Sequence, residues 1–136
     1  MNKLLGLSLF LFFSMGVFAQ ESIYSDEKLN IQMTVESLKD QKNDNFFEYY
    51  SLEIKNISDE KISFTPVFNY KTTTGELRNS TSHDGVHLIT LAPGETLKGN
   101  LEEYKELTLF KEFLIGNSGK KSSTVFYTLE SISINY

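Results

Sequence analysis

The chain has 136 residues, with 13 Lys and Arg against 18 Asp and Glu, which gives a formal net charge of −5 at pH 7. This acidic balance argues against nucleic acid or an anionic membrane as the main partner, because both are bound by concentrated positive charge. The chain contains no Cys, so disulfides, thiol nucleophiles, thiolate zinc sites and iron–sulfur clusters are excluded.

Residues 1–19 have the anatomy of a secretory signal peptide. Lys3 precedes an apolar run over residues 4–18, and Ala19 ends a cleavage motif of small residues. The run is shorter than the ~20 residues that a transmembrane helix needs. We therefore expect export to the periplasm or the cell exterior, with residues 20–136 as one domain and no membrane span after cleavage.

Alternation of apolar and polar residues dominates the rest of the chain. It predicts antiparallel strands with one face in the core and the other in water. The core strands begin at about residue 28, and sequences rich in turn-forming residues separate them. Pro66 lies inside one strand, so we expect a sheet edge or a bulge there. The predicted strands cover residues 29–36, 50–55, 62–71, 86–91, 107–115 and 124–136.

The segment after residue 100 supports two interpretations. Apolar residues at a spacing of three, together with the capping pair Asn100 and Glu103, indicate a helix over residues 101–114. Apolar alternation from Leu107 onwards instead indicates a strand over residues 107–115. We favour the strand, because the segment leads through a glycine-rich loop into another predicted strand.

Six to eight short strands in a chain of this length predict an all-β fold, a two-layer antiparallel β-sandwich. Two turn sequences and the strands beside them form a recognisable pattern, made of Asn56, Ser58, Asp59, Lys61, Ile62 and Phe64, followed by Leu91, Pro93, Gly94, Glu95 and Thr96. This pattern resembles the small immunoglobulin-like (Ig-like) domains of exported bacterial proteins. The resemblance implies an Ig-like sandwich and no activity, and the chain lacks the Cys and Trp of the antibody core.

Few residues have the pattern of a catalytic or cofactor site. His83, Asp84 and His87 are the candidate metal ligands, since two imidazoles and a carboxylate can bind zinc. A strand starting at residue 86 would not bring the two imidazoles together, so we favour solvated loop residues. The sequence contains no recognisable nucleophile elbow or phosphate-binding loop. We therefore expect neither catalysis nor a bound cofactor.

Aromatic residues crowd positions 46–50. Alternation places Phe46 and Tyr50 on one face of the predicted strand and Phe47 and Tyr49 on the other, and one face should lie outside the sandwich. Exposed aromatic side chains on a sheet can bind a partner, which makes Phe47 and Tyr49 candidate partner-binding residues. We favour the other interpretation, that they pack under a neighbouring segment, because this is common for such residues.

The function that fits these features is an exported, non-catalytic module that recognises another envelope or secreted protein. Loops at one end of the sandwich, or an edge strand adding to a partner's sheet, would make the contact. One alternative is an inhibitor or accessory factor of a secreted hydrolase acting through loop 71–85. A less favoured alternative is a metal-binding protein or enzyme that uses His83, Asp84 and His87. The sequence leaves the oligomeric state open.

Overall fold

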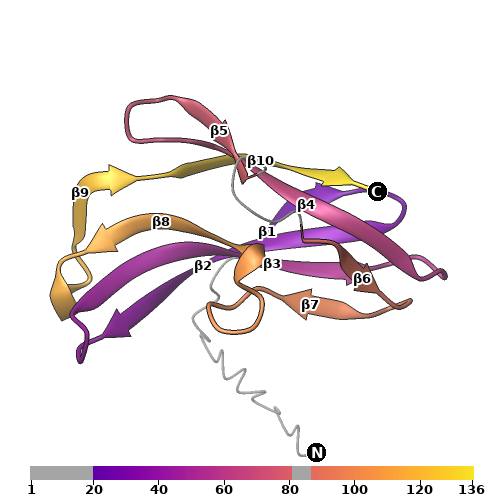
Figure 1. Ribbon diagram of the computed structural model, residues 1–136, viewed down its shortest axis with the longest axis horizontal. Helices are drawn as coiled ribbons and strands as arrows, with labels where there is room; N and C mark the ends of the chain where they lie inside the picture. Colours follow the sequence, from indigo (N-terminus) through magenta and orange to yellow (C-terminus); the bar gives the residue numbers. More distant parts are fainter. Residues whose placement is uncertain (1–19, 81–86) are drawn as a thin grey trace, which may run out of the picture.

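The computed structural model describes residues 20–80 and 87–136, and this part of the chain is all β (Figure 1). Within it, ten strands form two antiparallel sheets, the arrangement of a β-sandwich. The strands are β1 (Glu21–Ser25), β2 (Leu29–Asp40), β3 (Asn45–Asn56), β4 (Ile62–Lys71), β5 (Leu77–Asn79), β6 (Ile89–Leu91), β7 (Thr96–Lys98), β8 (Thr108–Leu114), β9 (Lys121–Phe126) and β10 (Thr128–Asn135).

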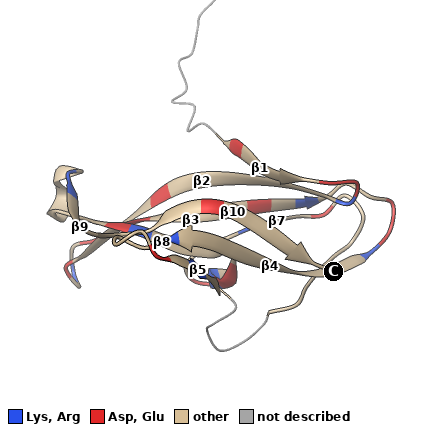
Figure 2. Cartoon of the chain, turned by 90° about the horizontal axis from the view of Figure 1, so that it is seen from above, with Lys and Arg blue, Asp and Glu red and all other residues tan. Residues whose placement is uncertain are grey.

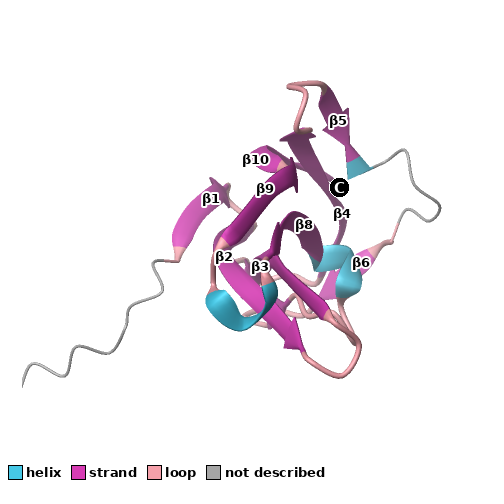
Figure 3. Cartoon of the chain, turned by 90° about the vertical axis from the view of Figure 1, so that its left-hand side faces the viewer, coloured by secondary structure: helices cyan, strands magenta, loops and turns pink. Residues whose placement is uncertain are grey.

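The larger sheet has six strands in the order β1-β2-β3-β8-β9, with β7 paired to β3 in line with β8. The smaller sheet has four strands in the order β10-β4-β5, with β6 paired to β4. In the end-on view, β4, β5 and β10 lie toward one side of the molecule, and β2 and β3 lie toward the other (Figure 3).

The core lies between the two sheets and is built by the inward faces of the long strands. Because side chains alternate along a strand, every second residue of β2, β3 and β4 faces inward. Fully burying one such apolar side chain stabilises the fold by roughly 1.5–3 kcal/mol. The fully buried apolar side chains are Leu29, Ile31, Leu52, Ile54, Phe64, Leu91 and Leu107, with Phe68 almost as buried.

The long strands include the ranges that alternation predicted, although β2 continues to Asp40 and β3 already begins at Asn45. The remaining differences concern short or divided elements. The expected count of six to eight is too low, because β1, β5 and β7 have 5, 3 and 3 residues and are too short to show a period. The single strand expected over residues 124–136 is two strands in different sheets. Tyr127 separates them, and its amide donates a hydrogen bond to the Lys111 carbonyl at 2.7 Å.

The segment after residue 100 forms the favoured strand and not the helix. A short 3-10 turn, η2 (Lys105–Leu107), leads directly into β8, while Asn100 Oδ1 accepts the amides of Glu102 and Glu103 at 3.0 and 2.7 Å. The capping signal is therefore real, but it closes one turn only. No helix in the described residues is long and apolar enough to cross a membrane.

Pro66 lies at a local sheet edge, as predicted. On one side of β4, β6 pairs with residues 62–64 and β5 pairs with residues 69–71, and no described strand fills the interval. The Phe68 amide points to this side and donates to Ser80 Oγ at 3.0 Å. Residues two apart present the same strand edge, so the missing N–H of Pro66 costs no ladder hydrogen bond.

Buried Asn56 joins the two turn sequences that carry the Ig-like resemblance. Its Nδ2 donates to the carbonyls of Glu60 and Leu91 at 2.8 and 3.1 Å. Its Oδ1 accepts the amide and the hydroxyl of Ser58 at 2.9 and 2.7 Å. The backbone amide of Gly94 donates to the Asn56 carbonyl, so the two turns are fixed to each other at one end of the sandwich.

A second polar tie links the β1–β2 turn to the end of β10. Asp26 accepts hydrogen bonds from the Tyr24 hydroxyl, the amides of Lys28 and Leu29 and the Tyr136 hydroxyl. The Lys28 ammonium also lies 4.6 Å from the centre of the Tyr136 ring. Partial burial raises the pKa of Asp26, but the hydrogen bond from Tyr136 and the others outweigh it and lower that pKa to about 2.

We expect the hydrogen bonds to Asp26 to make the stability of the fold sensitive to acid. Because the folded pKa of Asp26 is about 2 against an ordinary 3.8, its ionised form stabilises the fold above about pH 4, and this contribution disappears as the pH falls through 2. Asp26→Asn should cost on the order of 1–2 kcal/mol at neutral pH, allowing for solvent screening, and should flatten the loss below pH 4. Urea unfolding from pH 2 to 7 measures this. Glu27→Gln is the control, since neighbouring Glu27 has no polar partner in the described structure; an equal effect of both variants would contradict the prediction.

Candidate binding surface

Aromatic side chains collect on the outward face of the six-stranded sheet. The inward face of β3 carries core residues such as Leu52 and Ile54, so Phe47 and Tyr49 belong to the opposite face. In the β3–β8 ladder Tyr49 pairs with Phe110 and Phe47 pairs with Phe113. We call Phe47, Tyr49, Phe110 and Phe113 the aromatic surface.

The rings of the aromatic surface form a connected chain. The Phe47 ring centre lies 6.0 Å from those of both Tyr49 and Phe110, and Phe110 lies 4.8 Å from Phe113. Phe110 also meets the Tyr127 ring edge-on at 5.5 Å. Separations of this size are typical of favourable aromatic pairs. Phe113 ends the chain with 44% of its surface exposed, although it is a large apolar side chain.

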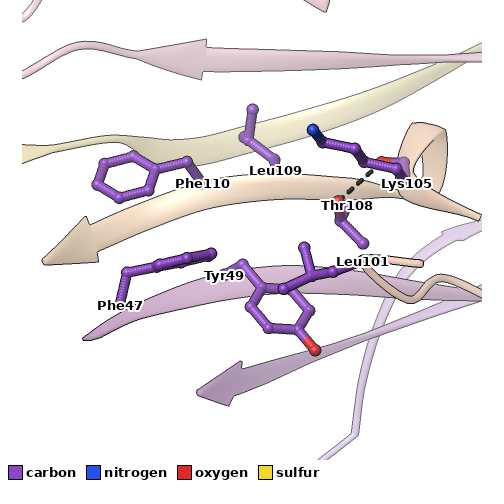
Figure 4. Close-up of a pocket in the computed structure, with 7 residues that line it drawn as sticks. All are labelled: Phe47, Tyr49, Leu101, Lys105, Thr108, Leu109 and Phe110. Atoms are coloured by element: carbon purple, nitrogen blue, oxygen red, sulfur yellow. Dashed lines mark hydrogen bonds between the residues drawn. The ribbon is translucent and has the colours of Figure 1, made fainter. Parts of the chain in front are cut away.

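A pocket of about 250 Å³ opens beside these rings (Figure 4). Residues 100–106 form a loop whose two ends meet where Gly99 lies against Leu107. Leu101 and Lys105 of this loop form one wall, and residues of β3 and β8 form the other. Lys105 has no ion-pair partner among the described residues. The lining residues are Phe47, Tyr49, Leu101, Lys105, Thr108, Leu109 and Phe110.

Tyr49 is the fixed part of the pocket wall. Only 8% of it is exposed, and its hydroxyl donates to Glu36 Oε2 at 3.1 Å. The Lys98 ammonium lies 2.7 Å from the other oxygen of Glu36. Burial acts to raise the pKa of Glu36, but hydrogen bonds from Lys98 and Tyr49 outweigh it and lower that pKa. Glu36 therefore stays ionised and holds the Tyr49 ring in place.

Two glutamates beside the aromatic surface, Glu48 of β3 and Glu112 of β8, are paired with lysines. Lys111 Nζ lies 3.1 Å from carboxylate oxygens of both Glu48 and Glu112, and Lys121 Nζ lies 3.3 Å from Glu112. Burial acts to raise the pKa of Glu112, yet its hydrogen bonds with Lys111 and Lys121 lower it overall, and the pKa of Lys111 is raised. Glu112 and Lys111 therefore hold their charges at neutral pH, which suits a structural network better than proton transfer.

The structure brings some of the predicted site residues together and leaves others apart or undescribed. It brings Phe47 and Tyr49 together on one face, and it adds Phe110 and Phe113, which the sequence analysis missed. His83 and Asp84 lie outside the described residues, as does most of the second half of loop 71–85. His87 is exposed just before β6. Residues 20–80 and 87–136 contain no group of three His, Cys, Asp or Glu side chains that could hold a metal ion.

The fold defines an all-β protein of two antiparallel sheets with an aromatic surface on the larger one. No family model, curated protein or solved structure matches the chain.

Proposed function

We propose that the chain is an exported, non-catalytic module with an Ig-like sandwich, and that its aromatic surface binds another envelope or secreted protein. The apolar leader over residues 1–19 supports export. The single observation that carries the binding proposal is the aromatic surface, where exposed Phe113 continues a chain of ring contacts into an open pocket. A large apolar side chain exposed beside an open, apolar-lined pocket is typical of an interaction site.

The shape of the pocket suggests what the partner presents. A volume of about 250 Å³ has room for one large side chain, and aromatic or aliphatic anchors in pockets often dominate binding energy. The Lys105 ammonium, which has no ion-pair partner in residues 20–80 and 87–136, would meet an acidic group of the partner. We therefore propose a partner that inserts one apolar side chain and places a carboxylate beside it.

The non-catalytic part of the proposal is supported by the state of the acids. Glu48 and Glu112 are each paired with Lys111, and Glu36 is paired with Lys98. A general acid needs a pKa raised toward neutrality, whereas the pKa of Glu36 and that of Glu112 are lowered.

Photo-crosslinking in the source cells tests the binding site. We expect a photoreactive phenylalanine analogue at position 113 to crosslink to one protein. Phe47→Ala should reduce binding of that protein about tenfold or more, because it removes an anchor ring. Purified partner and titration calorimetry would give the affinity, and thermal melting would confirm that the variant is folded.

Leu77 provides the matched control, since it is 68% exposed but lies on β5 of the other sheet. Leu77 also belongs to the loop 71–85 that an inhibitor of a secreted hydrolase would use. Crosslinks at position 77 alone, or loss of binding in Leu77→Ala but not in Phe47→Ala, would favour the inhibitor and contradict the aromatic surface. If neither position 113 nor position 77 crosslinks to a protein, the proposal that the chain binds a protein is wrong.

A further inference from the structure

Half of β2 lies at an uncovered sheet edge. β2 has 12 residues and pairs with β3 along its whole length, without a bulge. On its other edge β1 pairs only with Asn30 to Met33. Residues 34–40 therefore have no neighbouring strand on that side within the described structure. Figure 2 shows β1 running beside only one part of β2.

A regular, uncovered edge of this kind presents N–H and C=O groups ready to pair with another strand. Natural proteins usually shorten, twist, cover or charge such an edge. Here the strand is long and unbulged. Its side chains are small or uncharged at Thr34, Val35, Ser37 and Leu38, and charged at Glu36, Lys39 and Asp40. An added strand would be bound by main-chain hydrogen bonds.

We propose that residues 34–40 form the interface between two copies of this chain, related by a two-fold axis and joined as one continuous antiparallel sheet. A two-fold axis perpendicular to the sheet keeps the same face of both copies on the same side, so only residues of equal parity can lie opposite each other. The register centred on Ser37 puts Ser37 opposite Ser37, Glu36 opposite Leu38, and Thr34 opposite Asp40.

Length and charge both select this register. With Ser37 at the axis, residues 34–40 of one copy fill the uncovered stretch of the other and stop beside Met33, where β1 begins to pair. Moving the axis to residue 36 places two Glu36 carboxylates opposite each other. Moving it to Leu38 places Glu36 opposite Asp40. Like charges directly opposite across strands are destabilising.

The interface is locally neutral although the chain as a whole carries −5. Glu36 and Asp40 are balanced by Lys39 of the same strand and by Lys98, which lies 2.7 Å from Glu36. Two copies can therefore approach at this edge without the repulsion that their overall charge would cause elsewhere.

The outward face gains apolar contact in the same register. Leu38 pairs with Phe47 across β2 and β3, and Phe47 pairs with Phe113 across β3 and β8. With Glu36 of the second copy opposite Leu38, the two Leu38 side chains are diagonal neighbours close to the axis. The apolar row then runs without a break from one copy to the other. This dimer does not depend on the partner proposed above.

Sedimentation equilibrium of residues 20–136, which include every described strand, tests the dimer. We expect a concentration-dependent dimer between micromolar and near-millimolar protein. Ser37→Lys and Ser37→Glu each place two like charges across the axis and should weaken dimerisation about tenfold or more. An equimolar mixture of the two variants should associate again, because Lys then lies opposite Glu.

The control is Ser25→Lys, which adds the same charge at an exposed position at the far end of β1. The dissociation constant of its dimer should equal that of the unchanged chain. A protein that stays monomeric at every concentration overturns the proposal. So does a dimer that neither Ser37 variant weakens, and so do two Ser37 variants whose mixture fails to associate.

Discussion

Asn56→Ala is expected to lower the free energy of unfolding by about 3 kcal/mol. The Asn56 side chain is fully buried, and both its amide nitrogen and its carbonyl oxygen are fully used in hydrogen bonds. Removing it leaves the Leu91 carbonyl without this donor and the Ser58 amide without its acceptor, whereas the Glu60 carbonyl keeps the Ser58 hydroxyl as a donor. Each buried polar group left unpaired costs about 1–3 kcal/mol, and a cavity adds to the loss.

Urea denaturation monitored by circular dichroism measures the change, with the midpoint and slope fitted separately. Asn43→Ala is the matched control, because Asn43 lies in an exposed turn and its side chain donates to Asp40 at 2.7 Å. It should change stability by no more than about 0.5 kcal/mol. If Asn56→Ala has an effect as small as the control, the two turns are not held together by Asn56.

The contact between the two turn sequences was not predicted from the sequence. Residues 56–61 and 91–96 look unrelated along the chain, yet Asn56 and Gly94 join them directly. The long strands, in contrast, were predictable, because one face of each packs in the core and burial imposes alternation on the residues of β2, β3 and β4. Local pattern and global packing agree in these places.

The alternation pattern gave the wrong strands where an element's position depends on its pairing with another strand. β7 has 3 residues and exists because β3 offers an edge beside it. β9 and β10 read as one strand because each alternates relative to its own sheet, and nothing local marks the change of sheet at Tyr127. Short elements of this kind are decided by long-range contacts that a local pattern does not contain.

Half of the candidate site was predictable. Phe47 and Tyr49 are two apart, so a strand necessarily puts them on one face. Phe110 and Phe113 are three apart, a spacing that suggests a helix. They reach the same face because the β3–β8 ladder shifts between Glu48 and Tyr49, which leaves Lys111 as an extra residue in β8. The bulge is set by pairing with β3, so the sequence of β8 alone does not reveal it.

Gly99→Ala should disturb both the core and the pocket, because Gly99 closes the loop that forms one pocket wall. A Cβ on Gly99 would lie 2.5 Å from the Leu107 carbonyl oxygen and 2.8 Å from Leu107 Cβ. Gly99 itself is held to β3, since its amide donates to the Leu52 carbonyl at 2.8 Å and its carbonyl accepts the Ser51 hydroxyl at 2.7 Å. Leu107, which is fully buried, would therefore have to move.

We expect Gly99→Ala to cost about 2–3 kcal/mol in urea unfolding, in the range of overpacked cores. Gly75→Ala separates this steric effect from backbone strain. Gly75 has a φ of +83° with nothing within 4 Å of an added Cβ, so its loss should be about 1 kcal/mol. If the two variants cost the same, the contact between Gly99 and Leu107 is not tight. Because Leu101 and Lys105 move with the loop, Gly99→Ala should also weaken partner binding at temperatures where the variant is still folded, whereas Gly75→Ala should leave binding unchanged.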